Sequence, residues 1–151
     1  MGNPAAEGSV LHVILHEREG VIGGADLHVL DLAVAQQRDR RWRPVILTPR
    51  APQDYLDRLS KAGLRVAKIS KLSSLPKLIN AYGIGLVHAH GYEANYLVAT
   101  MHIAFRSWAR LPTVITAHGW IETAPWHRLK TSADRACARV ADVRILSLIH
   151  I

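Results

Sequence analysis

Three apolar segments of this chain are each followed by histidines or glycines, residue types that can act on a polar ligand. The segments and the residues after them are Leu11–Leu15 with Gly23 and Gly24, Leu86–Val87 with His88, His90 and Gly91, and Val114–Thr116 with His118 and Trp120. Histidine titrates near neutral pH, so it can orient a hydroxyl or transfer a proton. Adjacent glycines before a helix let backbone amides approach an anion without a Cβ in the way.

Each of these groups also has a structural interpretation. Gly23-Gly24 can be a plain tight turn, and its spacing is neither a dinucleotide fingerprint nor a P-loop. His88 and His90 are expected on the same side of a strand end, where they suit ligand hydroxyls, a metal ion or simple packing. Further ligands of a binuclear metal site are missing nearby, so we expect no metal and no cofactor. His118 can be a hydrogen-bonded structural histidine, and Trp120 can stack on a sugar ring or anchor its loop.

Strands and helices are expected to alternate along the chain. The predicted strands are Val10–Leu15, Pro44–Thr48, Leu64–Ile69, Gly83–His90 and Pro112–Ala117, with Ala141–Ile145 as the start of a sixth. The predicted helices run from an Asp26 N-cap to Arg38–Arg41, over Gln53–Ala62, from a Ser73 or Ser74 cap to Tyr82, and over Glu93–Trp108 and Trp126–Ala141. This pattern predicts an α/β fold, a Rossmann-like doubly wound parallel sheet of five to six strands with helices on both faces.

In such a sheet all strand carboxyl ends lie on one edge, and ligands bind in the crevice outside that edge. We therefore expect the glycines and histidines named above to meet there.

Composition narrows the classes of function. With 151 residues, of which 49% are hydrophobic and 21% charged, the chain is expected to form one globular domain. The net charge is +7, but the basic residues are spread over predicted helices without an aromatic stacking platform. We therefore expect no nucleic-acid partner, and contact with an anionic membrane surface stays open. A single cysteine and no recognisable signal or membrane-spanning segment predict a cytoplasmic protein.

Four stretches, in this order, resemble the N-terminal domain of family 4 glycosyltransferases, which have the GT-B fold. They are residues 11–14, 23–33, 86–92 and 114–120, with further similarity at 132–135 and 141–143. The resemblance covers about residues 10–145. It implies a retaining glycosyltransferase that moves a hexose from a nucleotide-sugar donor to a glycan or lipid-linked acceptor, mainly by electrostatic stabilisation of the leaving group and without a metal.

The resemblance also implies roles for individual residues. Gly23 and Gly24 would lie near the donor diphosphate and the acceptor, and His118 would be the catalytic residue near the transferred sugar. The acceptor side would be lined by His88, His90 and Gly91. Asp26 stands where the family usually has Glu, one methylene longer, and His28 is kept.

A second domain that holds most of the donor is implied by the resemblance and is missing from this sequence. We therefore expect residues 10–145 to be an incomplete acceptor-side domain that is inactive by itself. The last six residues, 146–151, match a translated sequencing adaptor, and we expect a foreign tail there. Two other functions stay open on the residues: a non-catalytic Rossmann-like module for a carbohydrate or phosphate, and a metal-dependent hydrolase that uses His88 and His90.

Overall fold

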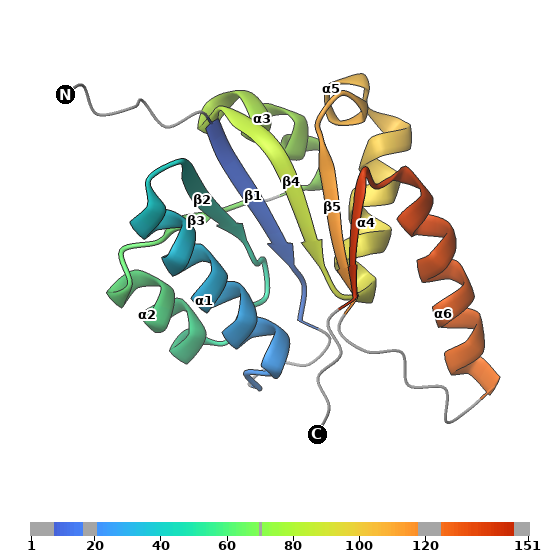
Figure 1. Cartoon of the computed structure of the whole chain (residues 1–151), viewed down its shortest axis with the longest axis horizontal. Coiled ribbons are helices and arrows are strands. Elements are labelled where there is room, and N and C mark those ends of the chain that lie inside the picture. Colours follow the sequence, from blue (N-terminus) through green and yellow to red (C-terminus); the bar gives the residue numbers. More distant parts are fainter. Residues whose placement is uncertain (1–7, 17–20, 70, 118–124, 147–151) are drawn as a thin grey trace.

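The fold is a central parallel sheet covered by helices on both faces (Figure 1). A computed structural model describes residues 8–16, 21–69, 71–117 and 125–146. The strands are β1 (Gly8–Ile14), β2 (Trp42–Leu47), β3 (Arg65–Ala67), β4 (Ile84–His90), β5 (Thr113–Ala117) and β6 (Val143–Leu146). All neighbours pair in parallel, in the order β3-β2-β1-β4-β5-β6. The predicted Rossmann-like α/β sheet is confirmed, with six strands.

The helices divide between the two faces of the sheet. They are α1 (Gly24–Asp39), α2 (Gln53–Lys61), α3 (Leu75–Tyr82), α4 (Tyr92–Ala104), α5 (Arg106–Ala109) and α6 (Pro125–Cys137), with short 3-10 turns at Leu72–Ser74 and Ala138–Val140. In Figure 1, α1 and α2 cover one face, whereas α3, α4 and α5 cover the other and α6 lies beside α4. Among the described residues, none of the helices combines the length and the apolar character that crossing a bilayer requires.

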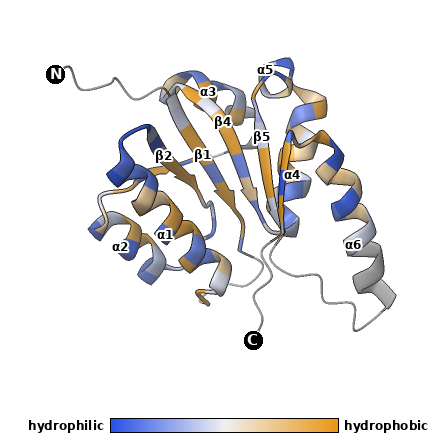
Figure 2. Ribbon diagram, in the orientation of Figure 1, coloured by the Kyte–Doolittle hydropathy of each residue, from blue (hydrophilic) through white to orange (hydrophobic). Residues whose placement is uncertain are grey.

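Alternating side chains of the strands build two separate cores. The larger one, on the α3–α4 face, contains buried residues such as Leu11, Val13, Val87, Val98 and Ile115. The smaller one, on the α1–α2 face, contains Ile14, Val29, Ile46, Tyr55 and Leu59. Figure 2 shows the hydrophobic residues concentrated on the strands and on helix sides. Because successive strand residues point to opposite faces, His12 lies on the face of the smaller core.

One predicted helix is two in the structure. The segment Glu93–Trp108 was expected to be continuous, but α4 ends at Ala104 and α5 begins at Arg106. Between them Phe105 has an extended backbone, with φ −131° and ψ 118°, and its side chain packs against the larger core. Packing of this aromatic ring therefore overrides the local helical pattern, which contains no glycine or proline to signal a break.

The last strand reaches one residue beyond its predicted end. Leu146, the first residue of the expected foreign tail, pairs with Ala117 of β5. Residues 147–151 lie outside the described part of the chain. Strand β6 also exposes two apolar side chains, Val143 and Ile145.

Candidate functional site

The sheet has its topological switch point between β1 and β4. These strands are neighbours at the centre of the sheet, but the helices that follow them, α1 and α4, pack on opposite faces. The first turns of the two helices therefore diverge at the carboxyl edge, where ligands bind in open α/β sheets. A cavity of about 300 Å³ lies there, and we call it the crevice. Its lining includes Gly23, Asp26, His90, Gly91 and Glu93.

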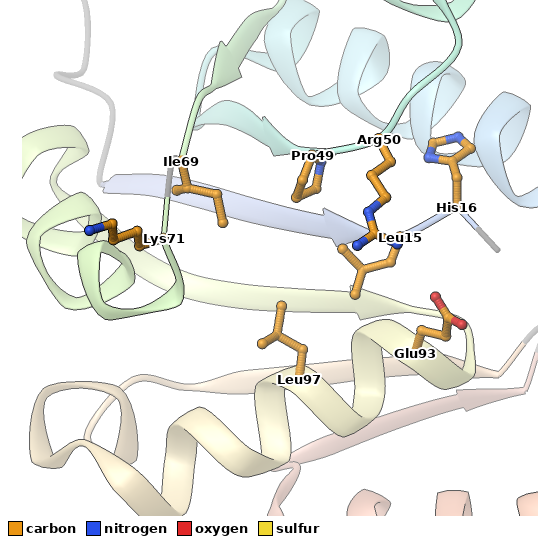
Figure 3. A pocket seen from close by; sticks show the side chains of 8 residues that line it. All are labelled: Leu15, His16, Pro49, Arg50, Ile69, Lys71, Glu93 and Leu97. Atoms are coloured by element: carbon orange, nitrogen blue, oxygen red, sulfur yellow. The ribbon is translucent and has the colours of Figure 1, made fainter. Parts of the chain in front are cut away.

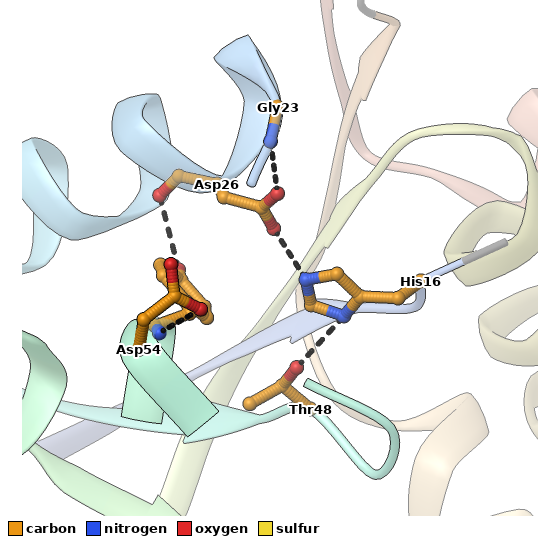
Figure 4. Close-up of polar contacts among 6 residues, drawn as sticks. His16, Gly23, Asp26, Thr48 and Asp54 are labelled. Carbon is orange, nitrogen blue, oxygen red and sulfur yellow. Dashed lines mark hydrogen bonds and ion pairs between the residues drawn. The ribbon is translucent and has the colours of Figure 1, made fainter. Parts of the chain in front are cut away.

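A buried polar network fixes the side of the crevice formed by α1 (Figure 4). The Asp26 carboxylate accepts the Gly23 N–H at 2.7 Å and lies 2.8 Å from Nε2 of His16. The hydroxyl of Thr48 lies 3.2 Å from Nδ1 of the same histidine. The His16 and Asp26 side chains are only 4% and 7% exposed, so water has little access to them. Each therefore relies on the other as a polar partner.

Asp26 was predicted as the N-cap of this helix, and that prediction is wrong. The N-cap is Gly23, and Asp26 stands three residues later, from where its carboxylate reaches back to the capping amide. This is the second half of a capping box, and it holds the Gly23 amide in a fixed position. The hydroxyl of Tyr55 donates to the Asp26 carbonyl at 3.0 Å. Burial, and after it the Asp26 carboxylate, raises the pKa of Tyr55, so this hydroxyl stays protonated and keeps its hydrogen bond.

Below the crevice three buried histidines from β1 and β4 gather in what we call the histidine cluster: His12, His88 and His90. Nε2 of His12 lies 2.8 Å from Oε1 of Gln36, and its Nδ1 lies 3.0 Å from Nε2 of His90. Nε2 of His88 lies 2.7 Å from the Thr116 hydroxyl. The rings of His88 and His90 pack with centroids 4.0 Å apart and planes tilted by 33°.

The protonation pattern of this cluster follows from its partners. Burial lowers the pKa of His12 to about 4, although the hydrogen bond to Gln36 opposes the shift, so His12 is neutral at pH 7. A carboxamide oxygen only accepts, so Nε2 of His12 carries the hydrogen and its Nδ1 is an acceptor. His90 must then donate from Nε2, which leaves Nδ1 of a neutral His90 as an acceptor.

The same three side chains have the donor atoms of a metal site. One ring nitrogen from each lies within 4.8 Å of the others, and neutral imidazoles are ligands that zinc accepts. In the structure, however, Nδ1 of His12 and Nε2 of His90 bond to each other. The arrangement can thus serve as a hydrogen-bonded support or, after losing that bond, as a metal site.

A family model for Glycosyltransferase Family 4 matches residues 22–146. The chain belongs to glycosyltransferase family 4. Its fold is similar to that of MnaA from S. aureus, solved together with UDP, with a TM-score of 0.59 and 11% sequence identity over 91% of this chain. The chain spans only 37% of the length of that protein.

A response regulator from Burkholderia multivorans aligns over 95% of this chain and 85% of its own, with 13% identity. Its TM-score of 0.34 supports no conclusion. No curated protein sequence matches the chain. Family membership agrees with the resemblance that the sequence motifs indicated.

The crevice of this family 4 chain collects part of the predicted set. Gly23, His90 and Gly91 line it, and Gly24 begins α1 directly after Gly23. His88 is not among the lining residues; it is buried and contacts Thr116. His118 and Trp120 lie outside the described residues, so their placement stays a prediction.

Gly91 opens the other flank of the crevice in a backbone conformation that only glycine adopts readily. Its φ is 84° and its ψ is 170°. The Gly91 amide donates to the Thr116 carbonyl at 3.1 Å, and its carbonyl accepts the Asn95 amide at 3.0 Å. This glycine therefore turns the chain from β4 into α4 while staying bonded to β5.

Sequence reasoning missed three polar residues near the crevice: His16, Thr48 and Glu93. Thr48 directly follows β2, as His118 follows β5, and His16 is the second residue after β1. Applied to the predicted strands Val10–Leu15 and Pro44–Thr48, that rule would have found His16 but not Thr48, which was expected inside its strand. Glu93 is the second residue of α4 and gives no comparable signal.

Proposed function

We propose that the crevice holds the diphosphate of a nucleotide-sugar donor and the reacting end of an acceptor, in a retaining glycosyltransferase that transfers a hexose. One observation carries the proposal: in a family 4 chain, the first turns of α1 and α4 open into one crevice whose rim contains Gly23 and Gly91. Helix N-termini bring unpaired amides and positive dipole ends, and glycines let a phosphate come close to them.

The chemistry that this arrangement favours is stabilisation of a leaving group. In the proposed reaction the bond between the anomeric carbon and the diphosphate oxygen breaks. The acceptor oxygen forms the new glycosidic bond, and its proton passes to the departing diphosphate. Amides held in place before the reaction stabilise the negative charge that develops on that diphosphate. His118, which follows β5 in the sequence, is the proposed catalytic residue near the transferred sugar, and Trp120 is proposed to bind the donor or acceptor.

We further propose that a second domain completes the donor site and that this chain by itself does not turn over substrate. The acceptor would be a glycan or a lipid-linked saccharide, and the reaction would take place in the cytoplasm. A non-catalytic carbohydrate or phosphate module would share the crevice but would show no sugar transfer in any longer form of the protein.

Donor binding is tested by adding one methyl group at the crevice. A Cβ at Gly23 would lie 3.7 Å from the Asp26 carboxylate, an ordinary contact, so Gly23→Ala should fold. The matched control is Gly85→Ala, an exposed glycine of β4 whose Cβ would meet the Trp42 ring at 4.0 Å. Since MnaA was solved with UDP, UDP is the first probe, and calorimetry or NMR titration is the measurement.

We expect weak UDP binding by the wild-type chain, a further loss of roughly tenfold or more in Gly23→Ala, and no change in Gly85→Ala. The size follows from the added Cβ keeping the phosphate away from an unpaired amide of the first turn, which costs one charge-assisted hydrogen bond. Equal affinities in all three proteins, or no binding of any nucleoside diphosphate at millimolar concentration, would contradict the donor site. In a longer protein with the second domain, His118→Ala should lower turnover about 100-fold.

A further inference from the structure

A second and larger cavity adjoins the crevice on the α4 side of β1. Its volume is about 430 Å³, within the range of roughly 300–1,000 Å³ of small-molecule sites. Leu15, His16 and Glu93 line both this cavity and the crevice. A molecule bound in the second cavity, which we call the side pocket, therefore has direct access to the place where the proposed donor would react.

The walls of the side pocket are mainly apolar. Leu15, Ile69 and Leu97 are partly buried against the larger core, and their side chains point into the pocket from the segment after β1, the segment after β3, and α4 (Figure 3). Pro49, which follows β2, closes a further side. Binding a hydrophobic group against such walls removes apolar surface from water, which is favourable. The pocket therefore suits a ligand with a hydrophobic part.

Charged groups stand at the ends of these apolar walls. Figure 3 shows the Arg50 guanidinium directed into the pocket beside Leu15, with Lys71 at the opposite end. Neither cation forms an ion pair with another residue of the described ranges. Glu93 supplies the acidic side chain of the pocket lining, on the wall shared with the crevice. An unpaired guanidinium beside apolar surface suits a phosphate, which it can bind through two parallel hydrogen bonds.

We propose that the acceptor is an amphiphile whose phosphate ester binds Arg50 and whose apolar part lies against Leu15, Ile69 and Leu97. Lys71 adds positive charge at the far end. The Glu93 carboxylate accepts a hydrogen bond from the acceptor, which turns the reacting hydroxyl towards the crevice. This inference rests on the proposed glycosyl transfer, since it names the class of acceptor for the same site.

The test uses n-octyl phosphate as the probe, below the concentration at which it forms micelles, and the 151-residue chain without any donor. Inorganic phosphate tests the charged part alone, and neutral n-octyl glucoside tests the apolar part alone. We expect octyl phosphate to bind at least about tenfold more tightly than either, because only it uses both halves of the pocket. Equal binding of inorganic phosphate would assign the site to free phosphate, and equal binding of the glucoside would remove the charge from recognition. Either result overturns the proposal.

Variants locate the binding. Arg50→Gln should weaken octyl phosphate about tenfold, whereas Arg58→Gln, an exposed arginine of α2, should stay within about twofold. Leu97→Asn tests the apolar wall. The readout is the ratio of the affinity for octyl phosphate to the affinity for inorganic phosphate, because partial unfolding lowers both and leaves the ratio unchanged. We expect the ratio to fall, and an unchanged ratio contradicts the assignment of the apolar wall. Equal loss of octyl phosphate binding in both arginine variants contradicts the assignment of Arg50. Gly23→Ala should leave octyl phosphate binding intact, so failure of the donor site and of the acceptor site are distinguished.

Discussion

His12 gives the chain a loss of stability in mild acid that a single substitution should remove. The side chain is fully buried, and burial lowers its pKa to about 4 from the ordinary value of 6.5. Between these two pH values His12 is protonated in the unfolded chain but stays neutral in the folded chain. The free energy of unfolding therefore falls as the pH falls. At about 1.4 kcal/mol per pH unit, the contribution of His12 amounts to about 3 kcal/mol. This part of the stability is fully present above pH 6.5 and is lost by about pH 4.

The assay is urea unfolding at several pH values from 7.5 to 4, with wild type, His12→Gln and His102→Gln. A glutamine can still donate to Gln36 but does not titrate, so His12→Gln should be less stable at pH 7.5 and lose clearly less stability on acidification. His102, a half-buried histidine of α4 outside the histidine cluster, serves as the control and should keep the wild-type slope. If wild type and His12→Gln lost stability in parallel, His12 would not be the group responsible.

Three further outcomes follow from the same geometry. Gly91→Ala should destabilise the fold by about 1–3 kcal/mol in thermal or urea unfolding, because φ of 84° with ψ of 170° strains any residue with a Cβ; an unchanged midpoint would contradict this strain. Asp26→Ala should cost about 2 kcal/mol by leaving the Gly23 amide without its acceptor and His16 without its carboxylate contact, and Asp26→Glu should restore most of it. Elemental analysis should find less than stoichiometric zinc; one zinc per chain, lost when His88 is replaced, would instead support the metal-dependent hydrolase.

Hydrophobic periodicity and the β–α alternation predicted the sheet and most elements, because these depend on local pattern. They did not predict the break at Phe105, which depends on where its ring packs in the larger core. The Asp26 prediction failed because an acidic residue near a helix start can act from the N-cap or from three residues later, and the preceding glycine decides between them.

Predicting the histidine cluster required knowing which strands are neighbours in the sheet, and no single sequence segment contains that information. His12 reads as an ordinary member of a buried strand, and its role appears only when β1 pairs with β4 and His12 stands opposite His88. The usual strand order of a doubly wound sheet places the first and fourth strands side by side, so that order plus the register would have been enough. The positions of Arg50 and Glu93 depend on loop and helix geometry, which spacing does not specify.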